Sequence, residues 1–569
     1  MKDVIVATIS AAIEKAHAAG KLKSSGVAIS TESPKDPAHG DIASNVALAL
    51  ARAEGKPPRA IAEIIRENVE LPEVVKEVSV AGPGFLNFRM APLYWHREMR
   101  RAYADTRNFF RPQKWSLIEG GNESVQIEFL SANPTGPLTV GHGRNAVLGD
   151  TIARMYEAAG FKVNREYYFN DGGRQMRLLG ESVRVRYLQD LGIDATMPED
   201  GYQGEYIIDI AKALRREKGD HLADGPSEGA APSESYNDRE TFRAAAVKAI
   251  FDEILASCKT LGVRFDSFKN ELDLVRDGRV DAVVNGLEDR GLVIKRDGAL
   301  WLKAEALGLP KDRVLVRSGE DADPVYRTPD IAYHIEKLER GFDLLVDVFG
   351  ADHIAEHDDV IAAVKALGHD PARIKAIIYQ FVTLMRGGEK VKMSTRKATY
   401  VTLDELIDEV GPDAVRFFFL FRKHNSHLDF DLDLAKKQAP ENPVFYVQYA
   451  HARLASIFRE GEKAGLTLPK ETSSIDLNLL SADELELAKN LLNFPEVATA
   501  AAQALEPHRM PFYLLELAAE FHRYYNKPGN RIIGPERELS LARLYLAGLL
   551  KSGIAHGLEL LGVTAPERM

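Results

Sequence analysis

The spacing of apolar residues divides the chain into a mixed beginning, an alternating middle and a helical end. Near the start, apolar residues recur at helical spacing around 5–18 and 41–68. A turn followed by a short strand is predicted for Gly82 to Met90, GPGFLNFRM. The stretch that ends at Ser124 contains glycine and proline and shows no period, which indicates a boundary. We therefore expect residues 1–110 to form a first domain of the α+β type.

From Val125 the pattern changes to strand, glycine-rich turn and helix. VQIEF alternates apolar with polar positions, and the loop SANPTGPLTVGHG follows it. The next segment stops at Gly160 and carries an apolar stripe at helical spacing, formed by Val147, Leu148, Ile152, Met155, Tyr156 and Ala159. FKVNREYYF, FDLLVDVFGADH and KAIIYQFVTLMRGG each predict a further strand. Strands alternating with helices predict a Rossmann-like parallel sheet with helices on its faces over 120–440.

Two further segments complete the division of the chain. Residues 217–240 contain almost no large apolar side chains, so we expect a flexible insertion there. After about residue 440 no strand pattern is present, and helical spacing continues to Met569. This predicts an all-helical C-terminal domain over 441–569. The expected fold class is therefore α/β, with an α+β N-terminal domain and a helical C-terminal domain.

The composition is that of an ordinary globular protein. The 569 residues exceed what one core usually organises, and 45% of them are hydrophobic and 28% charged. No apolar run approaches about twenty residues, so neither a signal peptide nor a membrane span is predicted. A single cysteine, Cys258, excludes a disulfide framework and a cysteine-rich zinc site, and favours a cytoplasmic location. The net charge of −11 favours a small-molecule enzyme, unless basic surface is confined to one face.

The first candidate site is the loop SANPTGPLTVGHG, which leaves a strand and enters a helix. The first N–H groups of a helix lack partners within it and carry partial positive charge, so this place suits the phosphates of a nucleotide. Gly141 and Gly143 let a ligand approach the backbone, and His142 can donate a hydrogen bond to a phosphate oxygen. The alternative is a tight strand–helix turn with a solvated histidine.

The second candidate site is the basic segment EKVKMSTRKATYVTLDEL. It contains Lys392, Ser394 and Arg396, and Thr402 with Glu405 predicts a capping box at the start of the next helix. A basic loop can clamp a polyphosphate and neutralise the charge that develops on pyrophosphate as it leaves. The alternative is a solvated charged loop, which is the commoner fate of such a run.

Together the two segments resemble the signatures of class I aminoacyl-tRNA synthetases. Thr139–His142 is similar to the HIGH motif and Lys392–Arg396 to the KMSKS motif, in the family's order. Within that class, NPTGPLTVGHGR, YYFNDGG, YRTPDIAYH and KMSTRK resemble arginyl-tRNA synthetase of the bacterial type. The resemblance extends along nearly the whole chain and implies an ATP-dependent arginine–tRNA ligase.

The resemblance assigns the handling of ATP to residues of both motifs. The implied catalytic residues are His142, Lys392, Thr139, Arg396 and Ser394, and the implied ATP contacts are Gly141, Gly143, His142, His353 and Lys392. The family usually has histidine at the position of Thr139, where it is thought to stabilise the phosphates in the transition state. Threonine keeps a donor hydroxyl on a shorter, uncharged arm, so we expect a slower activation step or compensation by neighbours.

Selection of arginine requires carboxylates aimed at a planar fork of donors. The resemblance implies that the arginine pocket contains Glu128, Ser131, Asn133, Tyr326, Asp330 and Asp352. A lysine there would leave paired acceptors unsatisfied, which can give strong rejection without editing. Without the resemblance, Asp330 is equally an ordinary acid in the first turn of a helix, and Tyr326 a half-buried strand residue.

Contacts with tRNA are expected in the C-terminal domain, which resembles the helical anticodon-binding domain of the family. Aromatic residues beside cations suit unstacked anticodon bases. The candidates are Tyr446, Gln448, Tyr449, Arg453, Tyr524 and Lys527. For each of them, a place in a helix core with a basic end at the surface is an alternative. The N-terminal domain resembles the family's extra domain that touches the tRNA elbow.

The expected reaction has two steps, in which arginine and ATP form arginyl-adenylate and the arginyl group then passes to tRNA(Arg). The resemblance further implies ATP bound with Mg²⁺, no protein-bound metal or zinc, no membrane association, a monomer, and arginine activation that requires bound tRNA. Two competing hypotheses stay open at this point. The chain could be a synthetase for another amino acid, or a non-catalytic RNA-binding or arginine-sensing relative, for which Thr139 is the hint.

Overall fold

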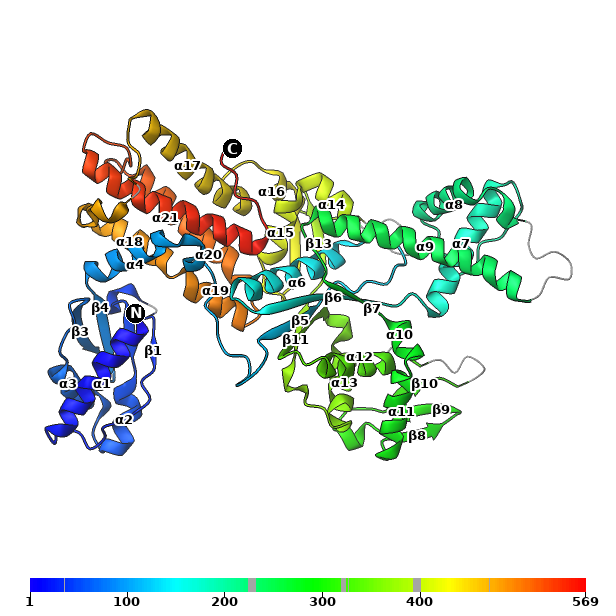
Figure 1. The fold of residues 1–569 in the computed structure, drawn as a ribbon, viewed down its shortest axis with the longest axis horizontal. Helices are drawn as coiled ribbons and strands as arrows, with labels where there is room; N and C mark the ends of the chain where they lie inside the picture. Colours follow the sequence, from blue (N-terminus) through cyan, green and yellow to red (C-terminus); the bar gives the residue numbers. More distant parts are fainter. Residues whose placement is uncertain (35, 224–231, 319–323, 326, 392–400, 470) are drawn as a thin grey trace. The chain divides into compact units, whose positions relative to one another are not determined.

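The computed structural model describes every residue except 35, 224–231, 319–323, 326, 392–400 and 470. Contacts within the chain divide it into two units, each built from three segments (Figure 1). The first unit contains Met1–Phe110, Arg453–Asn493 and Ala519–Gly553, and the second contains Arg111–Ala452, Phe494–Ala518 and Ile554–Met569.

The first unit begins with a four-stranded antiparallel sheet of order β1-β2-β4-β3, packed against three helices. Its elements are α1 (Lys2–Ala18), β1 (Thr31–Glu32), η1 (Pro37–His39), β2 (Ile42–Ser44), α2 (Val46–Glu54), α3 (Pro58–Asn68), β3 (Val75–Ala81) and β4 (Phe85–Met90). The predicted strand that ends at Met90 is confirmed. The prediction of one helical stretch over 41–68 is wrong, because Ile42–Ser44 pair with β4 and Gly55, with φ of 64°, ends α2.

Helices complete the first unit and continue across the unit boundaries. They are α4 (Pro92–Ala104), α5 (Thr106–Phe109), α17 (Pro443–Lys463), η7 (Thr472–Ser474), η8 (Leu477–Leu479), α18 (Ala482–Leu492), α20 (Arg509–Asn526) and α21 (Arg537–Leu561). The described residues after 440 contain no strand, as the sequence predicts. Glu484 in α18 is fully buried and accepts hydrogen bonds from Arg543 at 2.7 Å and from the Tyr524 hydroxyl at 2.5 Å.

The second unit is organised around a five-stranded parallel sheet of order β12-β11-β5-β6-β7. The strands are β5 (Ser124–Glu128), β6 (Lys162–Phe169), β7 (Ser267–Asn270), β11 (Leu344–Gly350) and β12 (Ile374–Tyr379). The chain runs from β5 outward to β6 and β7, and then returns to the other side of β5 to form β11 and β12. The order of strands therefore reverses between β5 and β11. In such sheets a ligand crevice opens at this point, beyond the carboxyl ends of the strands.

Helix α6 (Val140–Ala158) lies against β5, β6 and β11 at this point of reversal (Figure 1). Its apolar stripe and its end before Gly160, with φ of 90°, agree with the prediction. Two glycines make the close packing possible. A Cβ atom on Gly149 would lie 2.2 Å from the Phe129 ring, and one on Gly143 would lie 2.5 Å from Leu403.

A helical insertion separates β6 from β7. It contains α7 (Gly173–Asp190), α8 (Glu205–Lys218), η2 (His221–Ala223) and α9 (Pro232–Thr260). Within the segment 217–240, predicted as a flexible insertion, the structure places the end of α8, η2 and, from Pro232, the start of α9. Part of the predicted insertion, residues 224–231, lies outside the described residues.

The segment between β7 and β12 packs four helices beside a small antiparallel sheet of order β10-β9-β8. These elements are α10 (Glu271–Arg276), α11 (Arg279–Asp289), β8 (Val293–Arg296), β9 (Ala299–Leu302), η3 (Glu305–Leu307), β10 (Arg313–Val316), α12 (Arg327–Glu339), η4 (Ala351–His353), α13 (Ile354–Ala366) and η5 (Pro371–Arg373).

The last part of the second unit holds a third sheet and more helices. The elements are β13 (Val382–Arg386), β14 (Glu389–Lys390), α14 (Leu403–Val410), α15 (Pro412–Leu420), β15 (Leu428–Asp431), α16 (Leu432–Lys436) and α19 (Phe494–Gln503). KAIIYQFVTLMRGG, predicted as one strand, forms two strands of different sheets, since β13 pairs with β14 and β15. No helix in the described ranges is both long and apolar enough to cross a membrane.

Candidate active site

A cavity of about 540 Å³ lies at the carboxyl ends of the parallel strands. Seven residues expected from the sequence line it: Glu128, Ser131, Asn133, His142, Asp330, Asp352 and His353. Four others, Tyr326, Lys392, Ser394 and Arg396, lie outside the described residues. The fold therefore gathers residues from the ends of β5 and β11 and from the starts of α6 and α12 around one space.

The loop after β5 has an unusual backbone that Asn145 stabilises. Leu130 and Ser131 adopt positive φ angles of 68° and 44°, a conformation that costs on the order of 1–3 kcal/mol per non-glycine residue. Asn145 of α6 accepts a hydrogen bond from the Leu130 N–H at 2.7 Å and donates one to the Val348 carbonyl at 2.9 Å. One amide therefore joins the ends of β5 and β11 and holds the strained turn.

Glu128, at the end of β5, is engaged by partners inside the protein. Its carboxylate accepts hydrogen bonds from the Ser131 hydroxyl at 3.0 Å and from the ammonium of Lys337. Lys337 is fully buried on α12 and also donates to Asp347 at 2.7 Å. The buried ammonium therefore neutralises charge on Glu128, which the sequence had suggested as a carboxylate for the guanidinium.

The floor of the cavity is an ion network around Asp347 of β11. Burial alone would raise the pKa of the Asp347 carboxyl, but Lys337 and His334 lower it below its usual range. For the cations Lys337 and His334, burial lowers the pKa. The charge of Asp347 more than offsets this effect, so the pKa values of both side chains are raised. His334 holds Asp347 through Nε2 at 3.0 Å, and its Nδ1 contacts the backbone carbonyl of Asp330 at 2.7 Å.

For a different pair of carboxylates, Asp330 and Glu271, compensation is incomplete. The charges of His334 and Lys337 lower the pKa of Asp330, and hydrogen bonds from Tyr168 and Asn170 lower the pKa of Glu271, but both pKa values stay raised. Burial, together with the charges of Glu128 and Glu356, raises the pKa of Asp330 to about 6. Burial and the charge of Asp330 raise the pKa of Glu271 to about 7. Within the described part of the chain, neither carboxylate forms an ion pair with lysine or arginine. The cavity therefore presents two acids that a bound cation would stabilise.

Stacked tyrosines form one wall beside these acids. The rings of Tyr168 and Tyr333 lie 4.3 Å apart, and the Tyr168 hydroxyl donates to Glu271 at 3.0 Å. The Tyr333 hydroxyl donates to Glu166 at 2.5 Å, and Arg340 pairs with the same carboxylate at 2.6 Å. Each hydroxyl is thereby oriented, and the Tyr333 ring is stacked on Tyr168 and contacted by the Lys337 ammonium, which lies 4.2 Å from its centre.

The start of α6 brings His142 to the cavity. Thr139 is the N-cap of the helix, and its Oγ accepts the backbone N–H of His142 at 3.4 Å. The backbone N–H of Thr139 in turn donates to Nδ1 of His142 at 3.2 Å. Burial lowers the pKa of His142, so the ring is neutral at pH 7. Gly143, expected at the phosphates, packs closely against Leu403 and Phe419.

Three cavity residues have the composition of a metal site. The candidate ligand atoms of His334, Asp347 and His357 lie within 4.8 Å of one another. The Lys337 ammonium, 2.7 Å from Asp347, already neutralises this carboxylate, and both nitrogens of His334 already have partners. The chemistry of this group therefore fits a charge-paired floor and does not fit a metal centre.

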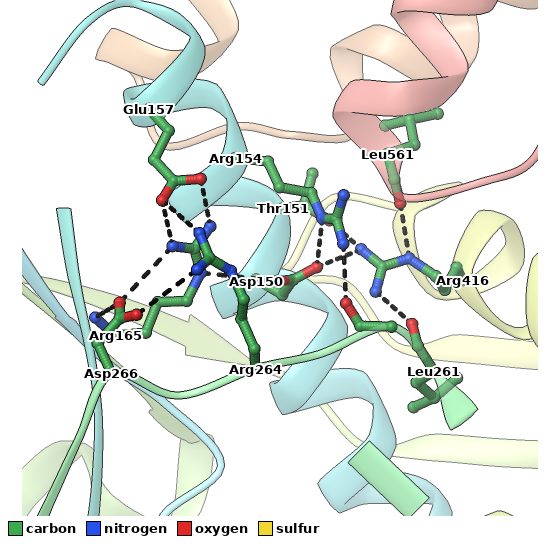
Figure 2. Close-up of polar contacts among 11 residues, drawn as sticks. Asp150, Thr151, Arg154, Glu157, Arg165, Leu261, Arg264, Asp266, Arg416 and Leu561 are labelled. Carbon is green, nitrogen blue, oxygen red and sulfur yellow. Dashed lines mark hydrogen bonds and ion pairs between the residues drawn. The ribbon is translucent and has the colours of Figure 1, made fainter. Parts of the chain in front are cut away.

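Behind the cavity, buried arginines fix α6 in place. Arg144 donates to the carbonyls of Gln380 at 2.6 Å and of Ser426 and Lys423 at 3.1 Å. Further along the helix, Asp150 accepts from Arg416 at 2.7 Å, and both side chains are 1% exposed (Figure 2).

Arg416 is shared by several segments. Its Nε donates to the Leu561 carbonyl at 2.7 Å and its other amino group to the Leu261 carbonyl at 2.9 Å (Figure 2). Arg154 also pairs with Asp150 at 2.6 Å, and Arg165 lies 3.8 Å from it. Through Arg416, helix α6 is thereby connected to the ends of α9 and α21.

Comparison with known proteins agrees with this geometry. Residues 111–419 match the model of the class I (R) tRNA synthetase catalytic domain. Residues 3–90 match the arginyl tRNA synthetase N-terminal domain, and residues 447–569 match the DALR anticodon binding domain. The chain belongs to the arginyl-tRNA synthetase family.

Relatives of the arginyl-tRNA synthetase family are similar along nearly the whole chain. An arginine–tRNA ligase from Desulfotalea psychrophila is 47% identical over 95% of this chain and 94% of its own length. One from Geobacter metallireducens is 44% identical over the full length of both. The solved arginyl-tRNA synthetase of Thermus thermophilus matches with a TM-score of 0.70 and 26% identity, over 98% of this chain and 99% of that one. The α/β fold class with its flanking domains agrees with the prediction.

Among the residues that reasoning from the sequence missed are Glu271, which lines the cavity of this synthetase, and Lys337, which is buried and pairs with the lining residues Glu128 and Asp347. Glu271 follows a four-residue strand and is the first residue of a short helix, so nothing in its local pattern marks it as a pocket acid. Lys337 could have been found, because Asp330, His334 and Lys337 have the spacing of one helical face in α12. An apolar helix face interrupted by an acid, a histidine and a lysine is a signal of a buried ion network.

The candidate tRNA contacts of this synthetase differ in how free their side chains are. Gln448 is 9% exposed and donates to Asp413 at 2.8 Å, and Tyr524 is held by Glu484 as described above. Tyr449 is 37% exposed, and Lys527 pairs with Asp483 at the surface.

The remaining two candidates lie between these extremes. Tyr446 is half-buried, and the Arg453 guanidinium lies 4.6 Å from the centre of the Tyr525 ring. Arg453 also lies 3.3 Å from Nδ1 of His522, so its guanidinium contacts two aromatic side chains. Tyr449 and Lys527 are exposed, whereas the polar groups of Gln448 and Tyr524 are used inside the fold.

Proposed function

We propose that the protein activates L-arginine with ATP and transfers the arginyl group to the 3′-terminal adenosine of tRNA(Arg), releasing AMP and pyrophosphate. The observation that carries this proposal is the pair of acids with raised pKa values, Asp330 and Glu271, in a cavity beside the start of α6. A guanidinium keeps its charge at any physiological pH and offers planar paired donors, so it satisfies both acids.

Arginine would bind with its guanidinium between these acids and the tyrosine wall. Asn133, whose Oδ1 accepts the Asn170 N–H at 3.0 Å, leaves its amide donors for the α-carboxylate of the amino acid. Glu128 and Asp347, already paired with Lys337, would set the shape and field of the pocket. A lysine side chain has no planar fork and would leave one acid unsatisfied.

In the first step, an oxygen of the arginine carboxylate attacks the α-phosphorus of ATP, and the bond to the bridging oxygen of pyrophosphate breaks. The helix start, Nε2 of His142 and the segment with Lys392, Ser394 and Arg396 would stabilise the charge on the phosphates. ATP enters as its Mg²⁺ complex, with His353 and Gly141 near it. In the second step, the 2′-hydroxyl of the terminal adenosine attacks the arginyl carbonyl, and AMP leaves with the electron pair of the broken anhydride bond.

The domain roles follow the family. Residues 1–110 would contact tRNA at its elbow, residues 120–440 would carry the catalysis, and residues 441–569 would bind the anticodon with side chains such as Tyr449 and Arg453. We propose a cytoplasmic monomer that needs no protein-bound zinc, and an activation step that requires bound tRNA.

Charging assays test this proposal directly. Purified tRNA isoacceptors are incubated with ATP and labelled arginine, or with labelled lysine as the control amino acid. We expect arginine on tRNA(Arg) alone, and ATP–pyrophosphate exchange only when tRNA is present. Tight tRNA binding without any charging would contradict the enzyme hypothesis, and exchange without tRNA would contradict the requirement for tRNA.

A further inference from the structure

Thr139 begins α6 with a capping box whose second member is a histidine. In the usual box, a glutamate or glutamine side chain at the third helical position returns to the N-cap N–H. Here Nδ1 of His142 takes that role at 3.2 Å, while the Thr139 Oγ accepts the His142 N–H at 3.4 Å. The capping residue and the catalytic histidine therefore hold each other.

The direction of the second hydrogen bond determines the protonation of the imidazole. The backbone N–H of Thr139 can only donate, so Nδ1 of His142 must accept and must carry a lone pair. A neutral imidazole that accepts at Nδ1 has its proton on Nε2, and an imidazolium cannot accept at all. The capping box therefore selects one neutral tautomer, and the burial that lowers the pKa of His142 acts in the same direction.

The backbone at Thr139 is itself fixed by the neighbouring chain. Thr139 forms an antiparallel bridge with Thr402, and the Leu403 N–H donates to the Leu138 carbonyl at 2.8 Å. Thr402 caps α14 with its own capping box, closed by Glu405. The N–H that faces His142 thus has an orientation set from two sides, by the cap and by the bridge.

We propose that Thr139 is a positioning residue, which holds His142 as an Nε2–H donor toward the ATP phosphates in the cavity. This inference rests on the proposed role of His142 in adenylate formation. The Thr139 Oγ accepts the His142 N–H in the cap, and the hydroxyl keeps its own proton to donate. Thr139 contributes by fixing the tautomer and the ring position of His142 before the substrate binds.

Two matched variants separate this role from mere stability. Thr139→Val keeps the β-branched shape and the backbone N–H but removes the Oγ acceptor, and Thr139→Ser keeps the acceptor. The protein is labelled with ¹³C and ¹⁵N in histidine, and His142→Gln identifies the His142 signals. We expect the wild type and Thr139→Ser to show the Nε2–H tautomer alone, and Thr139→Val to show both tautomers with a ring pKa closer to the ordinary value.

The kinetic readout is tRNA-dependent ATP–pyrophosphate exchange. We expect Thr139→Val to lower kcat roughly tenfold, less than the loss of a whole transition-state donor, with an unchanged KM for arginine and recovery in Thr139→Ser. The signals of the other histidines report whether the fold is intact. A wild-type ring protonated on Nδ1, or a Thr139→Val variant with one tautomer and full kcat, would overturn the inference. If the tautomers behave as expected but His142→Gln retains full activity, the result contradicts the proposed role of His142 in adenylate formation. It still supports the inference that Thr139 fixes the imidazole ring.

Discussion

Lowering the pH from 8 to 6 should weaken arginine binding, because two acids of the pocket titrate in this range. The pKa of Asp330 is raised to about 6 and that of Glu271 to about 7. The guanidinium is charged throughout, so both ion pairs form only when both carboxyls are ionised. Affinity is therefore almost complete at pH 8 and is lost as the pH falls through 7 and then through 6.

The size of the effect follows from the two pKa values. The doubly ionised fraction falls from about nine-tenths at pH 8 to about one-twentieth at pH 6, which weakens binding about 20-fold. In Glu271→Gln only Asp330 still titrates, and the same change of pH weakens binding about twofold. The variant should bind arginine less tightly at pH 8 but should show little dependence on pH.

Equilibrium dialysis with labelled arginine at pH 6, 7 and 8 measures both proteins. Glu305→Gln, at an exposed position outside the cavity, is the matched control and should behave as the wild type. The α-amino group of arginine stays protonated over this range, so it adds no titration of its own. A wild-type dissociation constant that changes less than about threefold, or a Glu271→Gln variant that keeps the full change, would refute the role of the two acids.

Further substitutions test the buried parts of the site. Lys337→Met leaves Glu128 and Asp347 without their shared cation and should lower the free energy of unfolding by about 3–5 kcal/mol, whereas Lys248→Met at an exposed pair should change the melting temperature little. Asp330→Asn should abolish arginine binding in dialysis. At pH 7.5 it should also stabilise the ligand-free protein, by at most about 3 kcal/mol, because it removes a charge that burial disfavours. An unchanged or lower melting temperature would contradict this expectation. Asn145→Ala should cost roughly 2–4 kcal/mol, since two buried backbone groups lose their partner, and a melting curve like that of the wild type would show that the turn after β5 holds itself.

The regular part of the fold could be predicted because its signals are local. The apolar run at Val125, the glycine-rich loop and the apolar stripe of α6 are patterns that each predict their element within about twenty residues, and all three predictions are confirmed. The three-residue strand Ile42–Ser44 could not be separated from the helices after it, because two alternations fit either period. The two strands of KAIIYQFVTLMRGG lie in different sheets, which a run of apolar residues cannot indicate.

Only those features of the site that lie within a single sequence segment could be predicted. Motif residues placed His142 and Asp330 at the cavity, and the structure brings them together. The state of each carboxylate depends on partners far away in sequence, such as Lys337, which lies 209 residues from Glu128. The sequence therefore suggested Glu128 as an acid for the substrate, whereas the structure shows a second acid with a raised pKa, Glu271, close enough to Asp330 for their charges to interact. Pairing of charges is a property of the tertiary fold.

The shared guanidinium of Arg416 has a practical consequence for handling the protein. The carbonyl of Leu561, seven residues past the point where α21 enters the second unit, is one of its acceptors. Just beyond it, Gln448 holds the carbonyl of Thr564 and His451 that of Pro566. A purification tag should thus be joined after Pro566 through a linker. A deletion that begins before Leu561 should lower catalytic activity, because it removes an acceptor of Arg416, the arginine that holds α6 and thereby His142.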